Sequence, residues 1–382
     1  MSEPHILLLG GDGAPSGVPR HITDLVRALR GRARITVLSE ADRGGYAALG
    51  GLGAAHVPLP GLSSRFDPRH WRAGRAALAA CLAAHPADLV WAHARMPVIM
   101  LRQLILSGGW TPPARTRLAL TYHGLPFGRG HRPGTGPLAR RLERRLLGAC
   151  PPLDLVFLTA AQQQRMQAAM GAALAPHRCH VLANASHLGP PDTPVSEPVS
   201  PPGRHLIMTG RAGWQKNYAA ALRLMRLLPG DVTLTLCGAG TDHTRFAARV
   251  RQLAGPAATR VRCMGPVRDV RPLLAQADGY MLTSRYEGLP IGALEASEYG
   301  LPLILADFDG AAALTEDHPM ALRLTGTLPA QARAIDALLS RYVADRAAQS
   351  AAIRAFWVTR YAPDRFAAAV RALVADGFGL PV

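Results

Sequence analysis

The chain has 382 residues, enough for two domains that each bury a core. Hydrophobic residues make up 48% of the sequence and charged residues 18%, a globular composition that excludes a disordered chain. The formal net charge of +17 favours an anionic partner: a phosphorylated substrate, an anionic lipid surface or nucleic acid. Nucleic acid is disfavoured, because aromatic residues are only 5% and the arginines are spread along the chain.

Two further features of the composition bear on the kind of protein: the single lysine and the spacing of the cysteines. Lys216 is the single lysine of the sequence, and the other permanently charged cations are arginines. A lysine is a compact point charge on a flexible stem, so this exception is a candidate functional residue. The five cysteines are widely spaced and include no Cys-x-x-Cys pair, which predicts reduced thiols of a cytoplasmic protein, not zinc ligands or disulfides. The apolar run near the N-terminus lacks a preceding basic segment and predicts a first strand, not a signal peptide.

The chain begins with a strand, a glycine-rich loop and a helix. His5 to Leu9 is the predicted strand, the helix covers Arg20 to Leu29, and Ile35 to Leu38 is the second strand. This βαβ start is typical of a doubly wound sheet, whose ligands lie at the carboxyl ends of the strands. The loop, residues 10–18, lacks a clean G-x-G-x-x-G, so a nicotinamide dinucleotide site is not favoured.

Two later strands of the first half each end in a histidine. Asp88 to His93 and Leu118 to His123 are short apolar runs, and Gly124 follows His123 directly. A single histidine at such a position is more often structural. Two on successive strands favour a functional role at the ligand edge of the sheet.

A basic amphipathic helix is predicted over residues 138–147. Its leucines fall at 138, 142, 146 and 147, and four arginines lie between them: Arg140, Arg141, Arg144 and Arg145. Two interpretations are open. The helix could lie on an anionic membrane, or it could be an ordinary surface helix whose leucines pack inward.

Residues 189–203 are rich in glycine and proline and predict a linker between two domains. The second half then alternates strands and helices again, with Leu206 to Thr209 and Val232 to Cys237 as its first strands. Glycine-containing loops follow these strands, at Gly210-Arg211 and at Gly238-Ala239-Gly240. The chain beyond Gly310 is predicted to be helical.

One loop of the second half carries two glutamates. It follows the predicted strand Gly279 to Thr283 and runs through Glu287 and Pro290 into a helix that contains Glu295. The free amides of a first helical turn form an anion site, and proline suits its first position. The alternative is an ordinary turn with two solvated glutamates.

These residues resemble glycosyltransferase family 4, retaining enzymes of the GT-B fold. The resemblance rests on Gly210-Arg211 through Lys216-Asn217, and on Glu287-Gly288 with Glu295 and Gly300-Leu301-Pro302. In the first half it rests on Gly17-Val18 and on Thr121 to Gly124. It covers roughly residues 5 to 315. The Leu289-Pro290 step departs from the family, which has an aromatic-Gly there, and this puts the identity of the donor sugar in doubt.

The resemblance implies a role for each matched residue. Arg211 and Lys216 would hold the diphosphate of a nucleotide sugar, Glu287 would face the sugar, and His123 would lie near the reacting centre. Glu295 would accept hydrogen bonds from the ribose. The remaining donor contacts would come from the loops around Gly17, Gly210, Gly238, Gly240, Gly288, Leu289, Pro290 and Ile291. The family needs no metal, and no metal ligand or cofactor is expected.

The predicted fold class is therefore α/β of the GT-B type, two doubly wound Rossmann-like domains that face each other across a cleft. The expected domains are 1–188 for the acceptor, a linker 189–203, 204–360 for the donor, and a C-terminal helix 361–382 that packs back on the first domain. The expected activity is retaining transfer of a hexosyl group from a UDP- or GDP-sugar to a saccharide or lipid-linked acceptor in envelope or exopolysaccharide synthesis.

Two alternatives remain beside this expectation. One is a nucleotide-sugar epimerase, which shares the GT-B architecture. The other is a basic membrane or nucleic-acid binding module without turnover. The expected location is the cytoplasm, with the Arg-rich helix holding the protein at the inner face of the membrane; nucleic acid is not an expected partner.

Overall fold

The protein divides into two compact units, and each is described by itself. The computed structural model describes residues 3–63, 67–128, 130–190 and 204–382. The first unit comprises Met1–Gly128, Arg132–Ala185 and Pro363–Val382, and the second comprises Arg129–His131 and Ser186–Ala362. Most of the predicted linker, residues 191–203, lies outside the described residues.

The first unit is built on a parallel sheet of seven strands in the order β3-β2-β1-β4-β5-β6-β7. Its strands are short and apolar, and those in the middle are buried on both faces, as parallel sheets require. Their bounds are β1 (His5–Leu9), β2 (Arg34–Ser39), β3 (Ala55–Pro58), β4 (Leu89–Ala92), β5 (Arg117–Tyr122), β6 (Asp154–Phe157) and β7 (Arg178–Val181).

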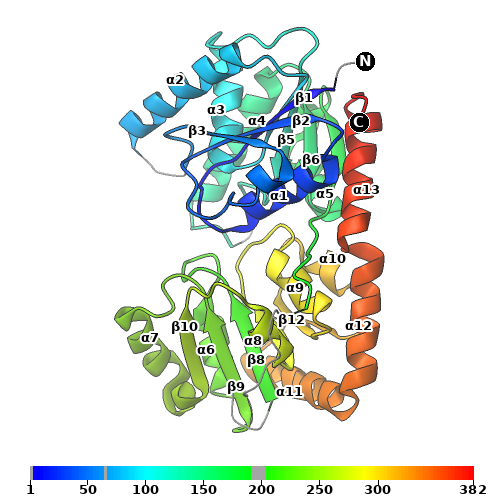
Figure 1. The fold of residues 1–382 in the computed structure, drawn as a ribbon. Coiled ribbons are helices and arrows are strands. Elements are labelled where there is room, and N and C mark those ends of the chain that lie inside the picture. The colour runs from blue at the N-terminus through cyan, green and yellow to red at the C-terminus, as the bar shows by residue number, and fades with distance from the viewer. Residues whose placement is uncertain (1–2, 64–66, 129, 191–203) are drawn as a thin grey trace. The chain divides into compact units, whose positions relative to one another are not determined.

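Helices cover both faces of this sheet (Figure 1). On β1, Leu7 and Leu9 point into one core and Ile6 and Leu8 into the other, because successive side chains of a strand alternate. The Leu7 side is covered by α2 (Pro68–Ala84), α3 (Arg95–Leu106), α4 (Thr135–Ala149) and α5 (Ala160–Met170). The other side is covered by α1 (Gly17–Leu29) and by α13 (Pro363–Ala372) from the far end of the chain.

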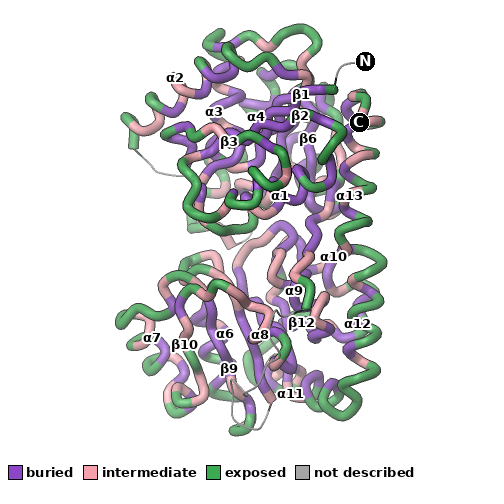
Figure 2. The backbone as a smooth tube through the Cα atoms, in the orientation of Figure 1, coloured by how far each residue is buried: buried purple, intermediate pink, exposed green. Residues whose placement is uncertain are grey.

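The second unit repeats the plan with a parallel sheet of six strands in the order β10-β9-β8-β11-β12-β13. Figure 2 shows the strands of both sheets largely buried and the outer sides of the helices exposed. The strands are β8 (Arg204–Thr209), β9 (Val232–Cys237), β10 (Val261–Gly265), β11 (Gly279–Leu282), β12 (Leu303–Ala306) and β13 (Ala321–Leu324). The helices are α6 (Tyr218–Met225), α7 (Thr244–Ala254), α8 (Arg271–Ala275), α9 (Ile291–Glu298), α10 (Ala311–Thr315), α11 (Leu328–Ala344) and α12 (Arg346–Arg360).

The prediction that the chain beyond Gly310 is helical is wrong at one place. Ala321–Leu324 is strand β13, which pairs in parallel with β12. Its sequence, Ala-Leu-Arg-Leu, consists of good helix formers. The strand forms because its backbone completes the hydrogen bonding of the β12 edge, a tertiary contact that local propensity does not report.

No helix among the described residues combines the length and the apolar character needed to cross a membrane. The cysteines are all free, and three of the five are buried.

Candidate active site

The candidate site of the second unit lies at the topological switch point of the sheet, the place between β8 and β11 where the strand order reverses. β8 and β11 are neighbours in the sheet, although the chain visits β9 and β10 between them. In doubly wound sheets, the carboxyl ends of two such strands are the usual ligand site. Lys216 follows β8, and Glu287 follows β11.

The Glu287 carboxylate is held by three side-chain donors. The Lys216 ammonium donates to Oε1 at 2.8 Å, and the Ser284 hydroxyl donates to the same oxygen at 2.8 Å. The Gln215 amide donates to Oε2 at 3.1 Å. The side chains of Lys216 and Glu287 are 20% and 11% exposed, so the pair is largely shielded yet open to a ligand. This arrangement fixes a carboxylate and an ammonium side by side.

Close backbone packing positions Lys216. Gly210 has a φ of 137°, and a β-carbon there would overlap the side chain of Lys216. Gly238, with a φ of 144°, lies against the carbonyl of Gly210 in the same way. The hydroxyl of Tyr218 donates to that carbonyl. The two glycines are therefore required here to let the β8 and β9 loops approach each other and to leave room for the lysine stem.

Arg211 differs from Lys216 in its surroundings. Its side chain is exposed and has no ion pair or hydrogen bond with any other residue in the described part of the chain. Gly240, at the end of the β9 loop, is half-buried and has a φ of 86°. The loop thus presents one cation that is already paired and one that remains available to an anion.

Helix α9 starts directly behind Glu287. Gly288, Leu289 and Pro290 are buried, and Pro290 is the N-cap, one position before its predicted place in the helix. The N–H groups of Ile291 and Gly292 point along the start of the helix and make no hydrogen bond to another described residue. An α-helix carries partial positive charge at this end, which complements an anion.

Glu295 lies one turn into α9 and is only 8% exposed. Gly310, after β12, packs so closely that a β-carbon there would overlap the carbonyl oxygen of Gly288. Burial raises the pKa of the neighbouring Tyr280 phenol, and the nearby Glu295 and Glu287 carboxylates raise it further. Tyr280 therefore stays protonated and shares a hydrogen bond with Thr209 at 2.8 Å, which ties β11 to β8 beneath the site.

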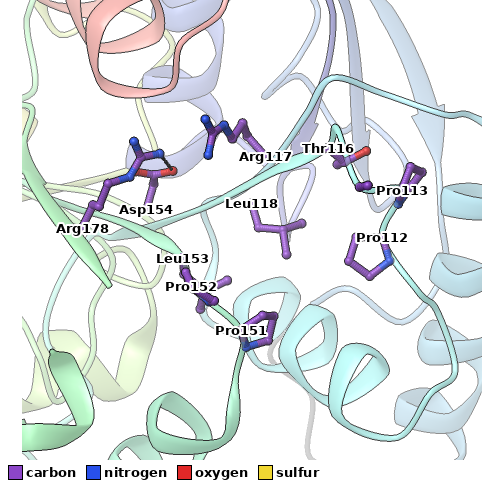
Figure 3. A pocket seen from close by; sticks show the side chains of 11 residues that line it. Pro112, Pro113, Thr116, Arg117, Leu118, Pro151, Pro152, Leu153, Asp154 and Arg178 are labelled. Atoms are coloured by element: carbon purple, nitrogen blue, oxygen red, sulfur yellow. Dashed lines mark hydrogen bonds and ion pairs between the residues drawn. The ribbon is translucent and has the colours of Figure 1, made fainter. Parts of the chain in front are cut away.

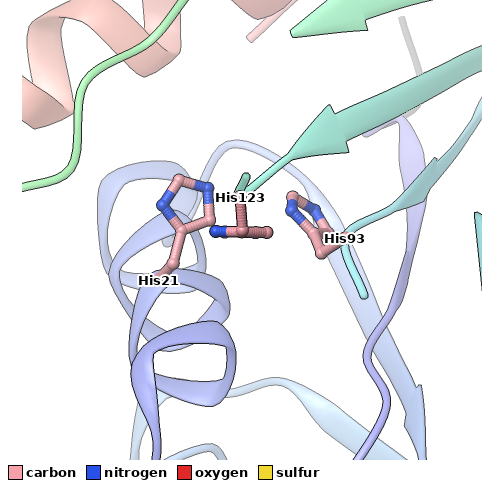
Figure 4. A group of neighbouring side chains, drawn as sticks. All are labelled: His21, His93 and His123. Atoms are coloured by element: carbon pink, nitrogen blue, oxygen red, sulfur yellow. The ribbon is translucent and has the colours of Figure 1, made fainter. Parts of the chain in front are cut away.

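The first unit holds the two other predicted site residues. Gly17 is the exposed first residue of α1. His123 directly follows β5 and lies beside His21 of α1 and His93, which directly follows β4 (Figure 4). Burial lowers the pKa of His21 to about 4 and that of His93 and His123 well below the usual value, and the neighbouring imidazoles lower the last two further. All three rings are therefore neutral at pH 7.

Helix α4 presents all four predicted arginines to solvent. Leu138 and Leu142 are 71% and 46% exposed, whereas Leu146 and Leu147 are buried. The interpretation of an inward-packed leucine stripe is therefore wrong for the first half of this helix. The buried face of α4 includes Glu143, which accepts hydrogen bonds from both Nη atoms of Arg102 at 2.6 and 3.1 Å.

A pocket of about 210 Å³ lies in the first unit, away from these residues (Figure 3). It is lined by Arg117, Asp154 and Arg178, the first residues of β5, β6 and β7. Arg178 and Asp154 form an ion pair of 2.6 Å across its wall. The pocket therefore sits at the amino ends of the strands, the opposite edge from His93 and His123, and is not the site that the sequence predicts.

Three residues of these clusters were not found from sequence. Ser284 and Gln215 donate to Glu287, and His21 joins the two histidines at the strand ends. Ser284 stands three residues before Glu287 and Gln215 directly before Lys216, so both could be suspected as neighbours of a matched motif. His21 lies mid-helix and carries no such signal.

Two family models match the chain, one in each half. Residues 15–189 match the model described as Glycosyltransferase Family 4, and residues 203–341 match the model described as Glycosyl transferases group 1. Among curated proteins, the glycogen synthase of Mycobacterium tuberculosis is 34% identical over 109 residues. That match covers 28% of this chain and 26% of the relative.

Several solved structures share the fold. HepE of Anabaena, crystallised with UDP and glucose, superposes with a TM-score of 0.74 at 18% identity over 98% of this chain and all of that one. The sucrose-phosphate synthase of Thermosynechococcus elongatus gives 0.76 at 15% identity, over 98% and 99%. WaaG, a glycosyltransferase involved in lipopolysaccharide biosynthesis, gives 0.69 at 18% identity, over 96% and 99%. The predicted GT-B architecture, two doubly wound parallel sheets with helices, is confirmed.

Proposed function

Since the chain belongs to the glycosyltransferases, with a Family 4 first half and a group 1 second half, we propose that it is a retaining hexosyltransferase that uses a nucleoside-diphosphate sugar. The observation that carries the proposal is the fixed Lys216–Glu287 pair, with the available cation Arg211 beside it, at the topological switch point of the second sheet. The solved structure with UDP and glucose in the same fold supports UDP-glucose as the first donor to test.

The charges of the site fit a departing diphosphate. Arg211 and Lys216 carry the positive charge, and the free N–H groups at the start of α9 add donors. In the proposed reaction these groups stabilise the negative charge that develops on the diphosphate, as preorganised donors do in other transferases. They supply what a divalent metal supplies elsewhere, so the proposed step uses no metal.

Glu287 faces the other end of the donor. With Oε1 fixed by Lys216 and Ser284 and Oε2 by Gln215, its carboxylate has a set orientation in which remaining lone pairs accept from sugar hydroxyls. In the proposed reaction Glu287 also stabilises positive charge on the anomeric carbon. Glu295, further into α9, accepts from the ribose hydroxyls.

The proposed transfer retains the anomeric configuration. The bond between the anomeric carbon and the diphosphate oxygen breaks, and a bond to the acceptor oxygen forms on the same face. The proton of the acceptor hydroxyl passes to the departing diphosphate. The acceptor is a saccharide or a lipid-linked saccharide, and the likeness in fold to WaaG supports envelope saccharides as the first class to test.

The decisive experiment removes the ammonium of Lys216. Lys216→Met removes the ammonium and keeps an unbranched stem of the same length up to the ε position. It is expected to lower kcat/KM for donor turnover about 10²- to 10³-fold, the usual cost of one electrostatic donor. The assay follows release of UDP or GDP from their sugars with candidate acceptors. The donor is chosen beforehand from a calorimetric binding series with both nucleotides.

Arg249→Ala is the matched control, because Arg249 is an exposed cation of the same unit on α7, away from these loops. Near-normal turnover in Lys216→Met would refute the assignment. Conversion of the donor to its epimer without release of nucleotide would point to an epimerase. An inverted anomeric coupling in the NMR spectrum of the product would refute retention.

We also propose that α4 brings the enzyme to the inner face of the cytoplasmic membrane, where lipid-linked acceptors reside. The support is its exposed surface: four arginines beside Leu138 and Leu142, both solvent-facing. Basic residues with exposed apolar side chains favour an anionic bilayer surface.

A further inference from the structure

The loop between β8 and α6 carries an exposed tryptophan two positions before Lys216. Trp214 is 44% exposed, and no other phenylalanine, tyrosine or tryptophan in the described part of the chain is exposed. Aromatic side chains stabilise a fold by being buried, so an indole in solvent gives up part of that free energy. The side chain of Trp214 therefore contributes less to packing than an indole can, and its surface is available to a ligand.

Three contacts hold Trp214 in one orientation. Its indole Nε1–H donates to the carbonyl oxygen of Gly130, a residue that belongs to the second unit, at 3.0 Å. The guanidinium carbon of Arg285 lies 4.0 Å from the centre of the indole, over one face, in a cation–π contact. The Arg285 Nε–H also donates to the Trp214 carbonyl oxygen at 3.2 Å. A side chain that is already fixed loses little conformational entropy when a ligand binds it.

Further contacts join the loops after β8 and β11 at this point. The backbone N–H of Arg285 donates to the carbonyl oxygen of Gln215 at 2.8 Å, and the Gln215 amide donates to that of Tyr286 at 3.1 Å. The Tyr286 ring stacks on His131 with 4.2 Å between the ring centroids and 14° between the planes. Because the Gln215 amide also donates to Glu287, the indole is one residue away from a direct partner of this carboxylate.

The open part of the indole is flat and apolar. The guanidinium covers one face and the bonded N–H occupies one edge, so the exposed surface lies on the opposite face and the other edges. The two Nη groups of Arg285 have no hydrogen-bond or ion-pair partner within the described ranges. A pyranose ring matches this surface, because it presents C–H groups on its face and hydroxyl groups around its edge.

We propose that Trp214 is the platform on which the acceptor saccharide stacks a pyranose ring. This inference rests on the proposed transfer, in which the donor binds at Lys216 and Glu287, whose side chains are 20% and 11% exposed. The more exposed indole is left for the second substrate, and the Nη groups of Arg285 donate to its hydroxyls. The platform consists of second-unit residues and adds to the acceptor contacts expected from residues 1–188.

Saturation-transfer NMR with simple glycosides tests the platform. The full chain is titrated, with and without UDP, with the methyl α- and β-pyranosides of glucose, galactose and mannose. For at least one glycoside we expect transfer to concentrate on the C–H protons of one ring face, because that face lies on the indole. Trp214→Ala is expected to weaken its binding about 10-fold, as loss of an aromatic contact does. Trp214→Phe, which keeps a ring, should weaken it less.

Leu227→Ala is the matched control. Leu227 is an apolar residue of the same unit, 47% exposed, and follows α6. This variant is expected to bind the glycosides as the unaltered chain does. The affinity for UDP or GDP, measured by calorimetry, is expected to be the same in Trp214→Ala as in the unaltered chain, and circular dichroism shows that each variant is folded.

Three results would overturn the platform. The first is that no glycoside of the series binds, and the second is that Trp214→Ala binds them as tightly as the unaltered chain. The third is a loss of nucleotide affinity in Trp214→Ala as large as the loss of glycoside affinity, which would place Trp214 in the donor site. The proposed transfer fails by a different result, the absence of UDP and GDP binding to the unaltered chain, so the two failures can be told apart.

Discussion

At the scale of single residues, the charged side chains of the candidate site differ in their hydrogen-bond partners. Glu287 takes hydrogen bonds from an ammonium, a hydroxyl and an amide, all within 3.1 Å. Arg211, on the loop that also holds Lys216, has no such partner in the described structure. Arg211 is therefore available to an anion, whereas Lys216 already interacts with Glu287. Lys216 is shielded because it pairs with Glu287, and Arg211 is exposed.

Asp24 on α1 offers a test of electrostatics away from the site. Its side chain is 7% exposed and pairs with Arg27 at 2.8 Å, yet burial raises the pKa of its carboxyl to about 6, although Arg20 and Arg27 lower it. Folding therefore takes up a proton between pH 3.8 and about 6. The stability that Asp24 contributes is full below pH 3.8 and is lost as the pH rises through 6.

We expect Asp24→Asn to be more stable than the unaltered chain at pH 8, by up to about 3 kcal/mol for a shift of two pKa units. At pH 4 the two proteins should be nearly equal. Urea unfolding at both pH values measures the difference in the free energy of unfolding. A difference that does not change with pH would contradict the assignment.

Lys216, Glu287 and Glu295 of the candidate site could be singled out from sequence because each follows a strand in a short, recognisable motif. Their partners could not. Gln215 and Glu287 are 72 positions apart and meet only because β8 and β11 are neighbours in the sheet. His21 joins His93 and His123 through the packing of α1, and no local pattern records that contact.

At the scale of elements, α4 shows how an ion pair with a residue far away in the sequence can set which face of a helix is buried. Its spacing is compatible with a buried stripe through Leu138, Leu142 and Leu146. The ion pair between Glu143 and Arg102, both nearly inaccessible, places position 143 inward, and Leu138 and Leu142 turn outward as a result. The sequence predicted the helix, but its orientation depends on a residue 41 positions away.

The exposed face of α4 predicts binding to anionic membranes. Vesicles that contain phosphatidylglycerol should carry the protein upward in a flotation gradient, and vesicles of phosphatidylcholine alone should not. Changing Arg140, Arg141, Arg144 and Arg145 to serine should reduce the partition coefficient about 10³-fold, at about 1 kcal/mol for each arginine.

Four exposed arginines of the second unit provide a control with the same change in charge: Arg223, Arg245, Arg249 and Arg251. Their replacement by serine should leave flotation largely unchanged. Equal loss in both variants would mean that the overall charge of the protein, and not α4, attracts it to the membrane. Binding that survives the α4 changes would exclude this helix as the contact.

At the scale of the whole molecule, both units use one winding plan, and the alternation of strands and helices was enough to predict it. What sequence did not predict is how completely the last segment enters the first unit. Val370, Val374 and Phe378 are fully buried in the core that α1 covers. The Phe378 ring meets Trp91 of β4 edge to face, with 5.2 Å between centroids.

Phe378→Ala should therefore destabilise the first unit by about 3–5 kcal/mol, the cost of a large cavity in a core. Hydrogen exchange should accelerate at the amides of β4 and remain unchanged at those of β11 in the second unit. Val358→Ala, at an exposed apolar position of α12, is the control and should alter neither. Equal acceleration in both units would mean that they unfold together.

The burial of residues 363–378 also has a consequence for synthesis. The ribosome finishes the first sheet long before it makes α13, since about 180 residues of the second unit lie between them. At 5–20 residues per second this gap lasts roughly 10 to 35 s. During that interval the apolar surface of α1 and the sheet beside it has no cover. Nascent chains stalled before residue 363 should therefore recruit chaperones that bind hydrophobic surface, and release from them should follow the emergence of Phe378.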